Sequence, residues 1–181
     1  MDSLINAILK LAREGGRLLS PEPVDIGELA TRSADAVRHQ LDERSATVTI
    51  DENLPVVLSD RLALEQVFGN LIDNAVKYLK PGRPGRIRIS SHEEASRVTI
   101  EVADNGRGIA EQDHERVFEL FRRSGVQDQS GDGIGLAHVR ALVRRLGGDI
   151  TVSSRLGEGS VFRVRLPRTL VIPEGRTHEQ R

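Results

Sequence analysis

One short stretch, Val102-Ala103-Asp104-Asn105-Gly106-Arg107-Gly108-Ile109, most constrains what this chain can fold into. Residues 97–102 before it alternate between polar and apolar, which predicts a half-buried strand. Asp104 therefore stands where a strand ends, next to two glycines whose backbone can adopt conformations closed to other residues. A carboxylate there could accept a hydrogen bond from a ligand amine, while the glycines let a flat ligand approach the backbone. The same residues are also typical of an ordinary turn, so the rest of the chain must decide between these interpretations.

The composition of the 181 residues suits one domain with an extra element at one end and excludes several classes of protein. The net charge of −1 argues against a nucleic-acid-binding surface. The absence of cysteine excludes disulfides and thiolate metal sites and fits a reducing compartment. No apolar run approaches the roughly 20 residues of a membrane span, and the N-terminus lacks the layout of a signal peptide. We therefore expect a soluble, cytoplasmic piece without direct membrane contact, although a full-length protein could be membrane-anchored.

The first 17 residues form an amphipathic pattern that stands apart from the rest. Gly15-Gly16 should end a helix there, and Pro21 and Pro23 should prevent its continuation. We interpret this segment as a partner-binding or coiled-coil helix with a linker, and the alternative is a helix that packs on its own domain. Its apolar stripe consists of Met1, Leu4, Ile5, Ile8, Leu11 and Ala12.

The globular part should begin near Asp25, where Glu28 three residues later completes a capping-box pattern for a helix to about Arg44.

His92 falls in a polar turn of a predicted hairpin, and we interpret it, like His39, His114 and His178, as a surface residue. The remaining predicted elements are strands at 47–50 and 56–58, a helix from Ser59 or Asp60 to about Leu79, hairpin strands at 86–91 and 97–103, a short helix at 111–117, a helix ending at Leu146 before Gly147-Gly148, strands at 150–153 and 160–166, and a polar tail.

Asparagine recurs on the predicted helix 60–79 at a spacing that aligns it with a lysine. Asn70, Asn74 and Lys77 are four and three residues apart, so they lie on one helix face. Two amide oxygens and an ammonium on one face could hold a hydrated Mg²⁺ and a phosphate together. The alternative is a solvated stripe in which Asp73 and Lys77 form an ion pair.

A second glycine-rich stretch, Gly131-Asp132-Gly133-Ile134-Gly135-Leu136, opens the helix that ends at Leu146. Such a turn presents bare amides and the positive end of a helix dipole, which suits phosphate. The polar residues 124–131 before it have the character of a lid. The stretch lacks the Gly-Lys-Ser/Thr of a P-loop and does not follow a strand as a dinucleotide-binding fingerprint does.

Together these residues resemble four sequence boxes of sensor histidine kinases, within the GHKL superfamily. The boxes are Asn70-x-x-x-Asn74-Ala-x-Lys77-Tyr78, Asp104-x-Gly106-x-Gly108, Phe118-x-x-Phe121-x-Arg123 and Gly131-x-Gly133-Ile-Gly135-Leu. The resemblance runs from about Val24 to Pro167. It implies the Bergerat fold, an α+β two-layer sandwich in which about three helices cover one face of a mixed five-stranded sheet.

The resemblance also implies a role for each matching residue in binding ATP and Mg²⁺. Asp104 would accept the adenine amino group, and Asn74 with Asn70 would hold the metal. Lys77 and Arg123 would contact phosphate, so that Asn70, Lys77 and Arg123 are the expected catalytic residues. The expected nucleotide-binding residues are Asn74, Tyr78, Asp104, Gly106, Gly108, Ile109, Phe121, Gly131, Gly133, Ile134, Gly135 and Leu136.

Asn70 separates two chemistries within this superfamily. Gyrase-type ATPases resemble one another in having Glu at this position, where a carboxylate can act as general base for water. An amide cannot do so, whereas a neutral imidazole is already nucleophilic and needs no base. Asn70 therefore favours phosphoryl transfer to histidine over hydrolysis.

The chain has no acceptor box of the pattern His-Glu/Asp-x-x-x-Pro. We therefore expect a catalytic fragment whose partners are a histidine-containing dimerisation domain and a response regulator, and which forms a homodimer through its N-terminal helix in the full-length protein. The expected division is 1–20 as the end of a dimerisation hairpin and linker, 24–167 as the catalytic domain and 168–181 as a flexible tail. The alternatives are a nucleotide-binding module without transfer and an ATP-driven conformational switch.

Overall fold

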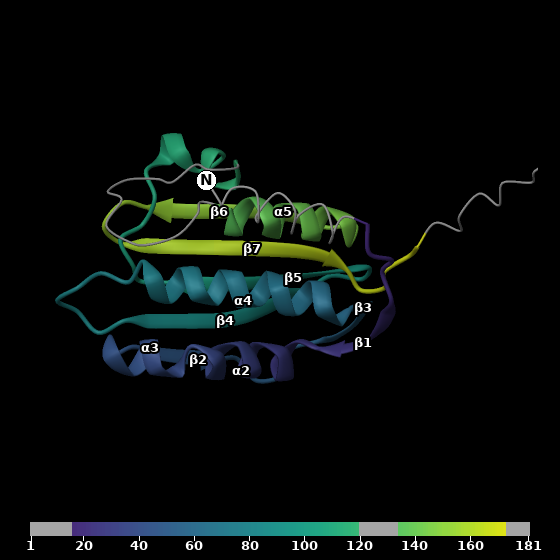
Figure 1. Ribbon diagram of the computed structural model, residues 1–181, viewed down its shortest axis with the longest axis horizontal. Helices are drawn as coiled ribbons and strands as arrows, with labels where there is room; N and C mark the ends of the chain where they lie inside the picture. The colour runs from purple at the N-terminus through teal and green to yellow at the C-terminus, as the bar shows by residue number, and fades with distance from the viewer. Residues whose placement is uncertain (1–15, 120–133, 173–181) are drawn as a thin grey trace, which may run out of the picture.

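The computed structural model describes residues 16–119 and 134–172, and its body is a five-stranded mixed sheet with helices on one face (Figure 1). The strand order is β2-β4-β5-β7-β6, with β2 parallel to β4 and every other neighbouring pair antiparallel. The predicted α+β sandwich is thereby confirmed. The strands are β2 (Thr47–Ile50), β4 (Arg86–Glu93), β5 (Arg97–Asp104), β6 (Asp149–Arg155) and β7 (Gly159–Pro167).

Three helices, α2 (Ile26–Ala36), α4 (Arg61–Lys77) and α5 (Gly135–Arg145), cover the same face of the sheet (Figure 1). Alternate strand residues point into this layer, as a half-buried strand requires. The opposite face carries charged side chains such as Arg163, whose Nε lies 2.6 Å from a carboxylate oxygen of Glu101. The core is therefore one-sided, and its strand residues are Ile87, Ile89, Val98, Ile100, Val102, Ile150, Phe162, Val164 and Leu166.

Helix α4 is the central element of the helical layer. Asp60 caps it, because the Ala63 N–H donates to Asp60 Oδ1 at 2.9 Å. It ends at Lys77, two residues short of the expected Leu79 and four before Pro81, and leaves Asn70 and Asn74 on its half-buried side. Its buried residues are Ala63, Leu64, Val67, Phe68, Leu71, Ile72, Ala75 and Val76.

A strand lies between the expected linker at 1–20 and the body of the domain. Residues Pro21–Asp25 form β1, which pairs antiparallel with β3 (Val56–Asp60) in a separate two-stranded sheet. Proline is tolerated there because an edge strand does not need every N–H for its ladder. β1 thus begins three residues before the expected domain start at Val24.

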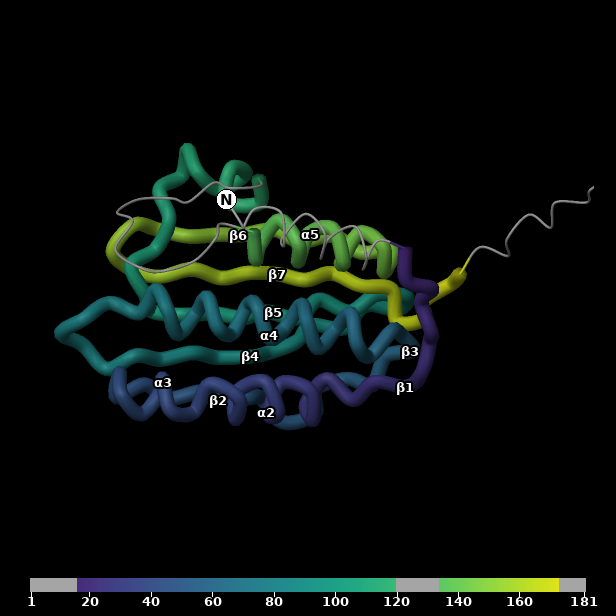
Figure 2. The backbone as a smooth tube through the Cα atoms, in the orientation of Figure 1, coloured from purple at the N-terminus to yellow at the C-terminus, as the bar shows by residue number. Residues whose placement is uncertain are grey.

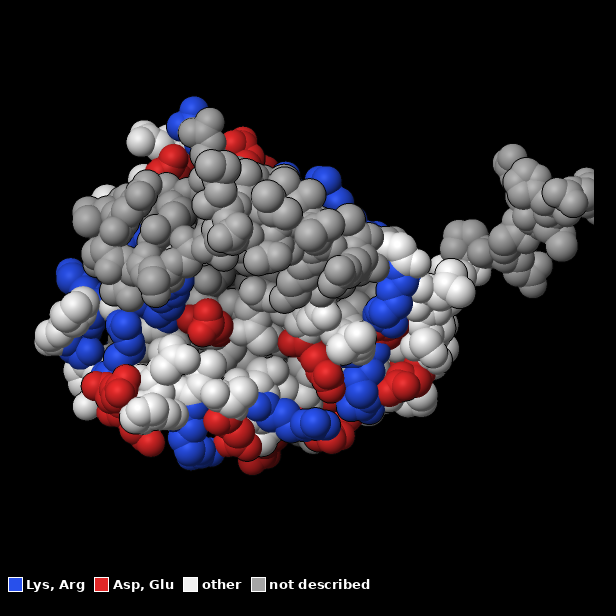
Figure 3. Space-filling view, viewed as in Figure 1, with Lys and Arg blue, Asp and Glu red and all other residues white. Residues whose placement is uncertain are grey.

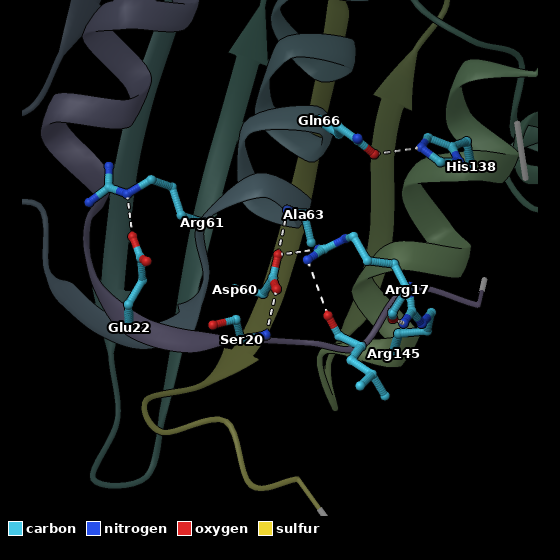
Figure 4. A network of polar contacts seen from close by, with 10 residues as sticks. Arg17, Ser20, Glu22, Asp60, Arg61, Ala63, Gln66, His138 and Arg145 are labelled. Atoms are coloured by element: carbon cyan, nitrogen blue, oxygen red, sulfur yellow. Dashed lines mark hydrogen bonds and ion pairs between the residues drawn. The ribbon is translucent and has the colours of Figure 1, made fainter. Parts of the chain in front are cut away.

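Residues 16–20 are also attached to the domain, through Asp60 (Figure 4). The Asp60 side chain is 2% exposed and accepts from Arg17 Nη2 at 2.5 Å and from the Ser20 N–H at 2.8 Å. Arg145, in the last turn of α5, donates to the Arg17 carbonyl at 2.5 Å. Figure 2 shows this purple segment passing the end of α5 before it enters β1. One buried carboxylate thus joins the start of α4 to the incoming chain.

Other local predictions need correction. The helix expected from Asp25 to Arg44 is two helices, α2 and α3 (Arg38–Glu43), with a break at Val37, whose N–H bonds to the Ala34 carbonyl at 3.2 Å. The short helix expected at 111–117 is two 3₁₀ turns, Glu111–Asp113 and Arg116–Phe118. Both corrections concern short helical segments that have no Gly or Pro to mark their ends.

Two predicted loops also turned out differently. His92 lies in β4 opposite Thr99 rather than in a turn, but it is exposed, as is His39, so both are surface residues as predicted. His114 is half-buried instead, with Nε2 3.3 Å from the Ile109 carbonyl. Within the expected tail, Leu170 is 6% exposed and its N–H donates to the Leu58 carbonyl at 2.7 Å. Core packing thus extends beyond Pro167.

In the described ranges, 16–119 and 134–172, no helix has both the length and the apolar character to cross a membrane. The expected N-terminal helix falls on residues 1–17, almost all of which lie outside these ranges.

Candidate nucleotide-binding site

Three elements converge on the predicted site: the C-terminal half of α4, the loop after β5 and the first turn of α5. A Cβ atom added at Gly106 would lie 2.4 Å from the Tyr78 carbonyl oxygen, so the loop touches the end of α4. A Cβ atom at Gly135 would lie 3.0 Å from Asn70 Oδ1, so the start of α5 touches the middle of α4. Asn70 and Tyr78 are eight residues apart, about 12 Å along the helix. The structure thus brings the predicted residues of three sequence boxes together.

Asp104 is the partly buried carboxylate of this site. The Gly106 N–H donates to Asp104 Oδ1 at 2.7 Å. Burial raises its pKa from 3.8 to about 6, although hydrogen bonds from the backbone N–H groups of Gly106 and Ser160 and the nearby charge of Arg83 oppose the rise. At neutral pH Asp104 remains an ionised acceptor in a poorly hydrated position, which suits recognition of a ligand amino group.

The two glycines after Asp104 are required by close backbone contacts. Gly108 has a φ of +70°, and a Cβ atom there would lie 2.1 Å from the Arg155 carbonyl oxygen. At Gly106 a Cβ atom would also approach Asp104 Oδ1 to 2.7 Å. The next residue, Ile109, is fixed by its N–H, which donates to Ser154 Oγ at 2.7 Å. Packing of this loop against both α4 and the β6–β7 turn is what excludes larger residues.

We expect Gly108→Ala to lower the free energy of unfolding by about 2–4 kcal/mol, because it combines a positive φ with a backbone clash. Urea unfolding would measure the change. The control is Gly69→Ala on α4, where an added Cβ meets nothing within 4 Å. This control should instead stabilise the protein by about 0.5–1 kcal/mol. Equal stability of the two variants would contradict the packing described for Gly108.

Tyr78 forms one wall of the site at the end of α4. The Arg107 guanidinium lies 4.3 Å from the centroid of its ring, and the Arg107 N–H donates to the Tyr78 carbonyl at 3.0 Å. Lys77 Nζ lies 5.8 Å from the same centroid. Within the described residues Lys77 forms no ion pair with Asp73, so the alternative of a simple solvated stripe gains no support.

Asn70 and Asn74 are the predicted metal ligands, and their donor chemistry fits the role. Asn70 Nδ2 donates to the Gln66 carbonyl at 2.8 Å, which leaves Oδ1 as an acceptor toward Gly135. Asn74 is half-buried and makes no side-chain hydrogen bond to the described residues. Among these residues no group of three His, Asp or Glu could form a protein-only metal site. Amide oxygens that complete the ligand set of a phosphate-bound Mg²⁺ suit this arrangement.

Helix α5 begins beside Asn70 without a side-chain cap at Ile134. The first N–H groups of a helix have no partner within the helix, so this end of α5, with the positive end of its dipole, suits an anion near Gly135 and Leu136. Basic side chains gather where α4 runs into the turn before β4, on the left of Figure 3. That stretch carries Lys77, Lys80, Arg83 and Arg86.

Four predicted site residues, Phe121, Arg123, Gly131 and Gly133, lie outside the described residues, as does the predicted lid at 124–131. Phe118, the first residue of the box Phe118-x-x-Phe121-x-Arg123, is buried against Phe162, with ring centroids 6.2 Å apart and planes at 86°. This edge-to-face contact anchors the segment that leads toward them.

Sequence reasoning missed three further polar features around the site. They are Arg107 over Tyr78, the buried His138 of α5, whose Nε2 lies 3.1 Å from Gln66 Oε1 on α4 (Figure 4), and Arg83 in the turn before β4. Each depends on contacts between segments far apart in the chain, and no local pattern signals them.

The sequence profile described as "Histidine kinase-, DNA gyrase B-, and HSP90-like ATPase" matches residues 59–170, more than half of the chain. The chain belongs to this family. The residues that match the profile include α4, the Asp104 loop and α5, the three elements that form the candidate site. The predicted resemblance to the ATP-binding domain of sensor histidine kinases is confirmed.

Curated relatives of this ATPase-family chain include sensor kinases. It is 36% identical over 165 residues to cyanobacterial phytochrome B of Nostoc sp., covering 90% of this chain and 22% of that protein. It is 37% identical over 173 residues to the adaptive-response sensory kinase SasA of Synechococcus sp., covering 92% of this chain and 45% of that protein. The chain thus spans less than half the length of these relatives.

Solved histidine kinases share the fold. Full-length ShkA, crystallised with AMPPNP, superposes with a TM-score of 0.78 at 32% identity and covers 94% of this chain and 36% of that chain. The mycobacterial sensor histidine kinase MprB gives a TM-score of 0.71 at 30% identity and covers 83% of this chain and 100% of that chain. The match to MprB thus covers the whole of that solved chain.

Proposed function

We propose that this chain is the catalytic domain of a sensor histidine kinase, which binds Mg-ATP and transfers its γ-phosphoryl group to a histidine on a dimerisation domain. The observation that carries the proposal is the convergence of Asp104, Tyr78 and Asn70 on one site beside the first turn of α5. The site combines an acceptor for an adenine amino group with amide oxygens and helix N–H groups suited to phosphates.

The proposed reaction breaks the bond between the γ-phosphorus and the oxygen that bridges it to the β-phosphate, and forms a bond to an imidazole nitrogen. The electron pair of the broken bond stays with ADP, and the imidazole nitrogen supplies the pair for the new bond. Asp104 and the wall at Tyr78 orient the base, while the α5 N-terminus and Lys77 face the phosphates. Bound Mg²⁺, held with Asn70 and Asn74, would supply charge neutralisation at the phosphates.

Asn70 favours transfer over hydrolysis in this proposal. Its amide cannot take a proton from water, and its Nδ2 is already committed to the Gln66 carbonyl. The geometry therefore supplies positioning without a general base at this point of the site. An ATP-driven conformational switch is the second candidate, and it predicts hydrolysis by the chain alone.

The decisive experiment compares three reactions of the purified chain with radiolabelled ATP. We expect binding of Mg-ATP, little release of phosphate and no acid-labile self-labelling. Adding a separate dimerisation hairpin that carries an acceptor histidine should give acid-labile phosphorylation of that hairpin. Rapid phosphate release by the chain alone would contradict the kinase proposal in favour of an ATPase.

The wider setting of the chain is part of the same proposal. Residues 1–20 would complete a dimerisation hairpin and linker, and a homodimer would form through the first helix. The phosphoryl group would pass from the histidine to the receiver domain of a response regulator in the cytoplasm. The kinase relatives support this setting, and ThkA, solved in complex with the response regulator TrrA, shares the fold at 23% identity.

A further inference from the structure

Arg83 lies in the turn between α4 and β4, and its guanidinium donates hydrogen bonds to backbone carbonyls of two other loops. Its Nη2 donates to the carbonyls of Gly106 at 3.0 Å, Gly157 at 3.2 Å and Glu158 at 3.2 Å, and also to that of Asn105. Gly106 follows Asp104, whereas Gly157 and Glu158 form the β6–β7 turn. One cation thus links three separate segments at the edge of the predicted adenine site.

Neighbouring contacts show that the Asp104 loop is held on both sides. Asn105 Oδ1 accepts from the Arg86 N–H at 2.7 Å, and Asn105 Nδ2 donates to the Pro84 carbonyl at 3.0 Å. The Gly157 N–H donates to the Arg107 carbonyl at 2.6 Å. Asn105 ties the loop to the turn before β4, the Gly157 N–H ties it to the β6–β7 turn, and Arg83 adds a link among all three segments.

The carbonyl cluster gives Arg83 a role that a neutral residue could not fill. Several converging carbonyl oxygens create a local negative potential, which a guanidinium neutralises with its donors. Without the cation these oxygens would repel one another, and Asn105 and Gly106 would lose the link that Arg83 makes to the β6–β7 turn, although the Gly157 N–H would still bond to the Arg107 carbonyl. Loss of this link would shift Asp104 while leaving the sheet intact.

We propose that Arg83 is a positioning residue for adenine recognition: it holds the Asp104–Gly106 segment against the β6–β7 turn so that the carboxylate meets the amino group of the base. The inference rests on the proposed binding of ATP. It concerns only the base end of the nucleotide, because Arg83 bonds to Gly106, which contacts the Tyr78 carbonyl. The expected phosphate end is where Gly135 meets α4 at Asn70, eight residues before Tyr78.

The test is the affinity of the whole chain for ATP and for inosine triphosphate, which has a carbonyl where adenine has its amino group. In the unmodified chain ATP should bind more tightly, because its amino group donates to Asp104, whereas the carbonyl at the same position of inosine triphosphate would repel the carboxylate. Arg83→Met should weaken ATP binding roughly 5- to 20-fold and inosine triphosphate binding less than about threefold. Arg83→Lys, which keeps the charge and a donor, should recover part of the ATP affinity.

Two controls separate positioning from general loosening. Arg88→Met removes an arginine paired with Asp51 on the open face of the sheet and should leave both affinities unchanged. In an Asp104→Asn background, Arg83→Met should have little further effect on ATP, because the two residues act on the same contact.

Equal weakening of both nucleotides by Arg83→Met, or no weakening of either, would overturn the inference. If ATP binds but Arg83 does not matter, the proposed function stands without it. If the unmodified chain does not distinguish the two nucleotides, the placement of adenine at Asp104 is wrong and the inference falls with it.

Discussion

Asp104→Asn should raise the Kd for ATP about 10- to 100-fold. The substitution removes a charge-assisted hydrogen bond and can turn an amide donor toward the donating amino group of the base. The backbone N–H of Gly106 can still bond to the asparagine oxygen, so the loop should keep its shape. Titration calorimetry with Mg-ATP measures the effect, and Asp149→Asn, an exposed aspartate at the far end of β6, is the matched control.

The pH dependence of the same binding provides an independent check. The pKa of Asp104 is raised by burial to about 6, so the carboxyl group gains a proton as the pH falls through that value. ATP affinity of the unmodified chain should therefore decrease between about pH 7 and pH 5, and Asp104→Asn should abolish this dependence. An affinity that stays constant across this interval would contradict the placement of adenine at Asp104.

The effect of Asp104→Asn on stability should have the opposite sign. A carboxyl group with a folded-state pKa above its unfolded value of 3.8 penalises the folded state as the pH rises from 3.8 through about 6. Asparagine removes that penalty. At pH 7 the free energy of unfolding of the variant should therefore exceed that of the unmodified chain by on the order of 1–2 kcal/mol. If the variant binds ATP more weakly but unfolds at a higher urea concentration, Asp104 contributes to binding at a cost in stability.

Asp60→Ala should have the largest effect on folding, lowering the free energy of unfolding by about 3–5 kcal/mol. It leaves Arg17 without its buried partner, removes the acceptor of the Ser20 N–H and uncaps α4. Asp60→Asn keeps a capping oxygen and should lose about half as much. Asp25→Ala is the control, because Asp25 caps α2 at an exposed position, where the loss should be about 1 kcal/mol.

The contribution of Asp60 should also disappear at low pH. Burial raises its pKa, but hydrogen bonds from Arg17 and from the N–H groups of Ser20 and Ala63 outweigh burial and lower the pKa below 3.8. Its stabilisation is therefore complete above 3.8 and is lost as the pH falls through the lowered folded-state pKa. Urea unfolding of the unmodified chain and of Asp60→Ala should converge at acidic pH. A constant difference down to about pH 2 would mean that the ion pair does not carry the effect.

The parts of the fold that the sequence predicted are those with local signals. Asp60 before an apolar helical pattern marked the start of α4, and alternation marked β5 up to Asp104. Gly147, with a φ of +75°, follows the end of α5 as the glycine pair indicated. In each case the residues of one turn or one strand are enough to predict the element, because the hydrophobic period and the residue at its end indicate the same structure.

The parts that failed depend on partners distant in sequence. Pro21 and Pro23 indicated a linker, but they lie in β1, which pairs with β3. Proline is tolerated in such an edge strand. Leu170 was assigned to the tail that follows Pro167, yet its N–H bonds to the carbonyl of Leu58, more than a hundred residues earlier. Arg83 was unremarkable in a glycine- and proline-rich turn, since its carbonyl partners come from two other loops.

The attachment of residues 17–25 has a consequence for engineering. A fusion that grafts a new input module at the sequence-based boundary near Val24 would cut through β1 and discard Arg17 and Ser20, which share Asp60 with α4. The shortened module would retain the predicted nucleotide-binding residues but lose the hydrogen bonds that attach its incoming chain to Asp60. Chimeric sensors joined upstream of Arg17 should therefore transmit a twist or pull from the input directly to the first turn of the asparagine-bearing helix, whereas those joined at Val24 should leave output and input uncoupled.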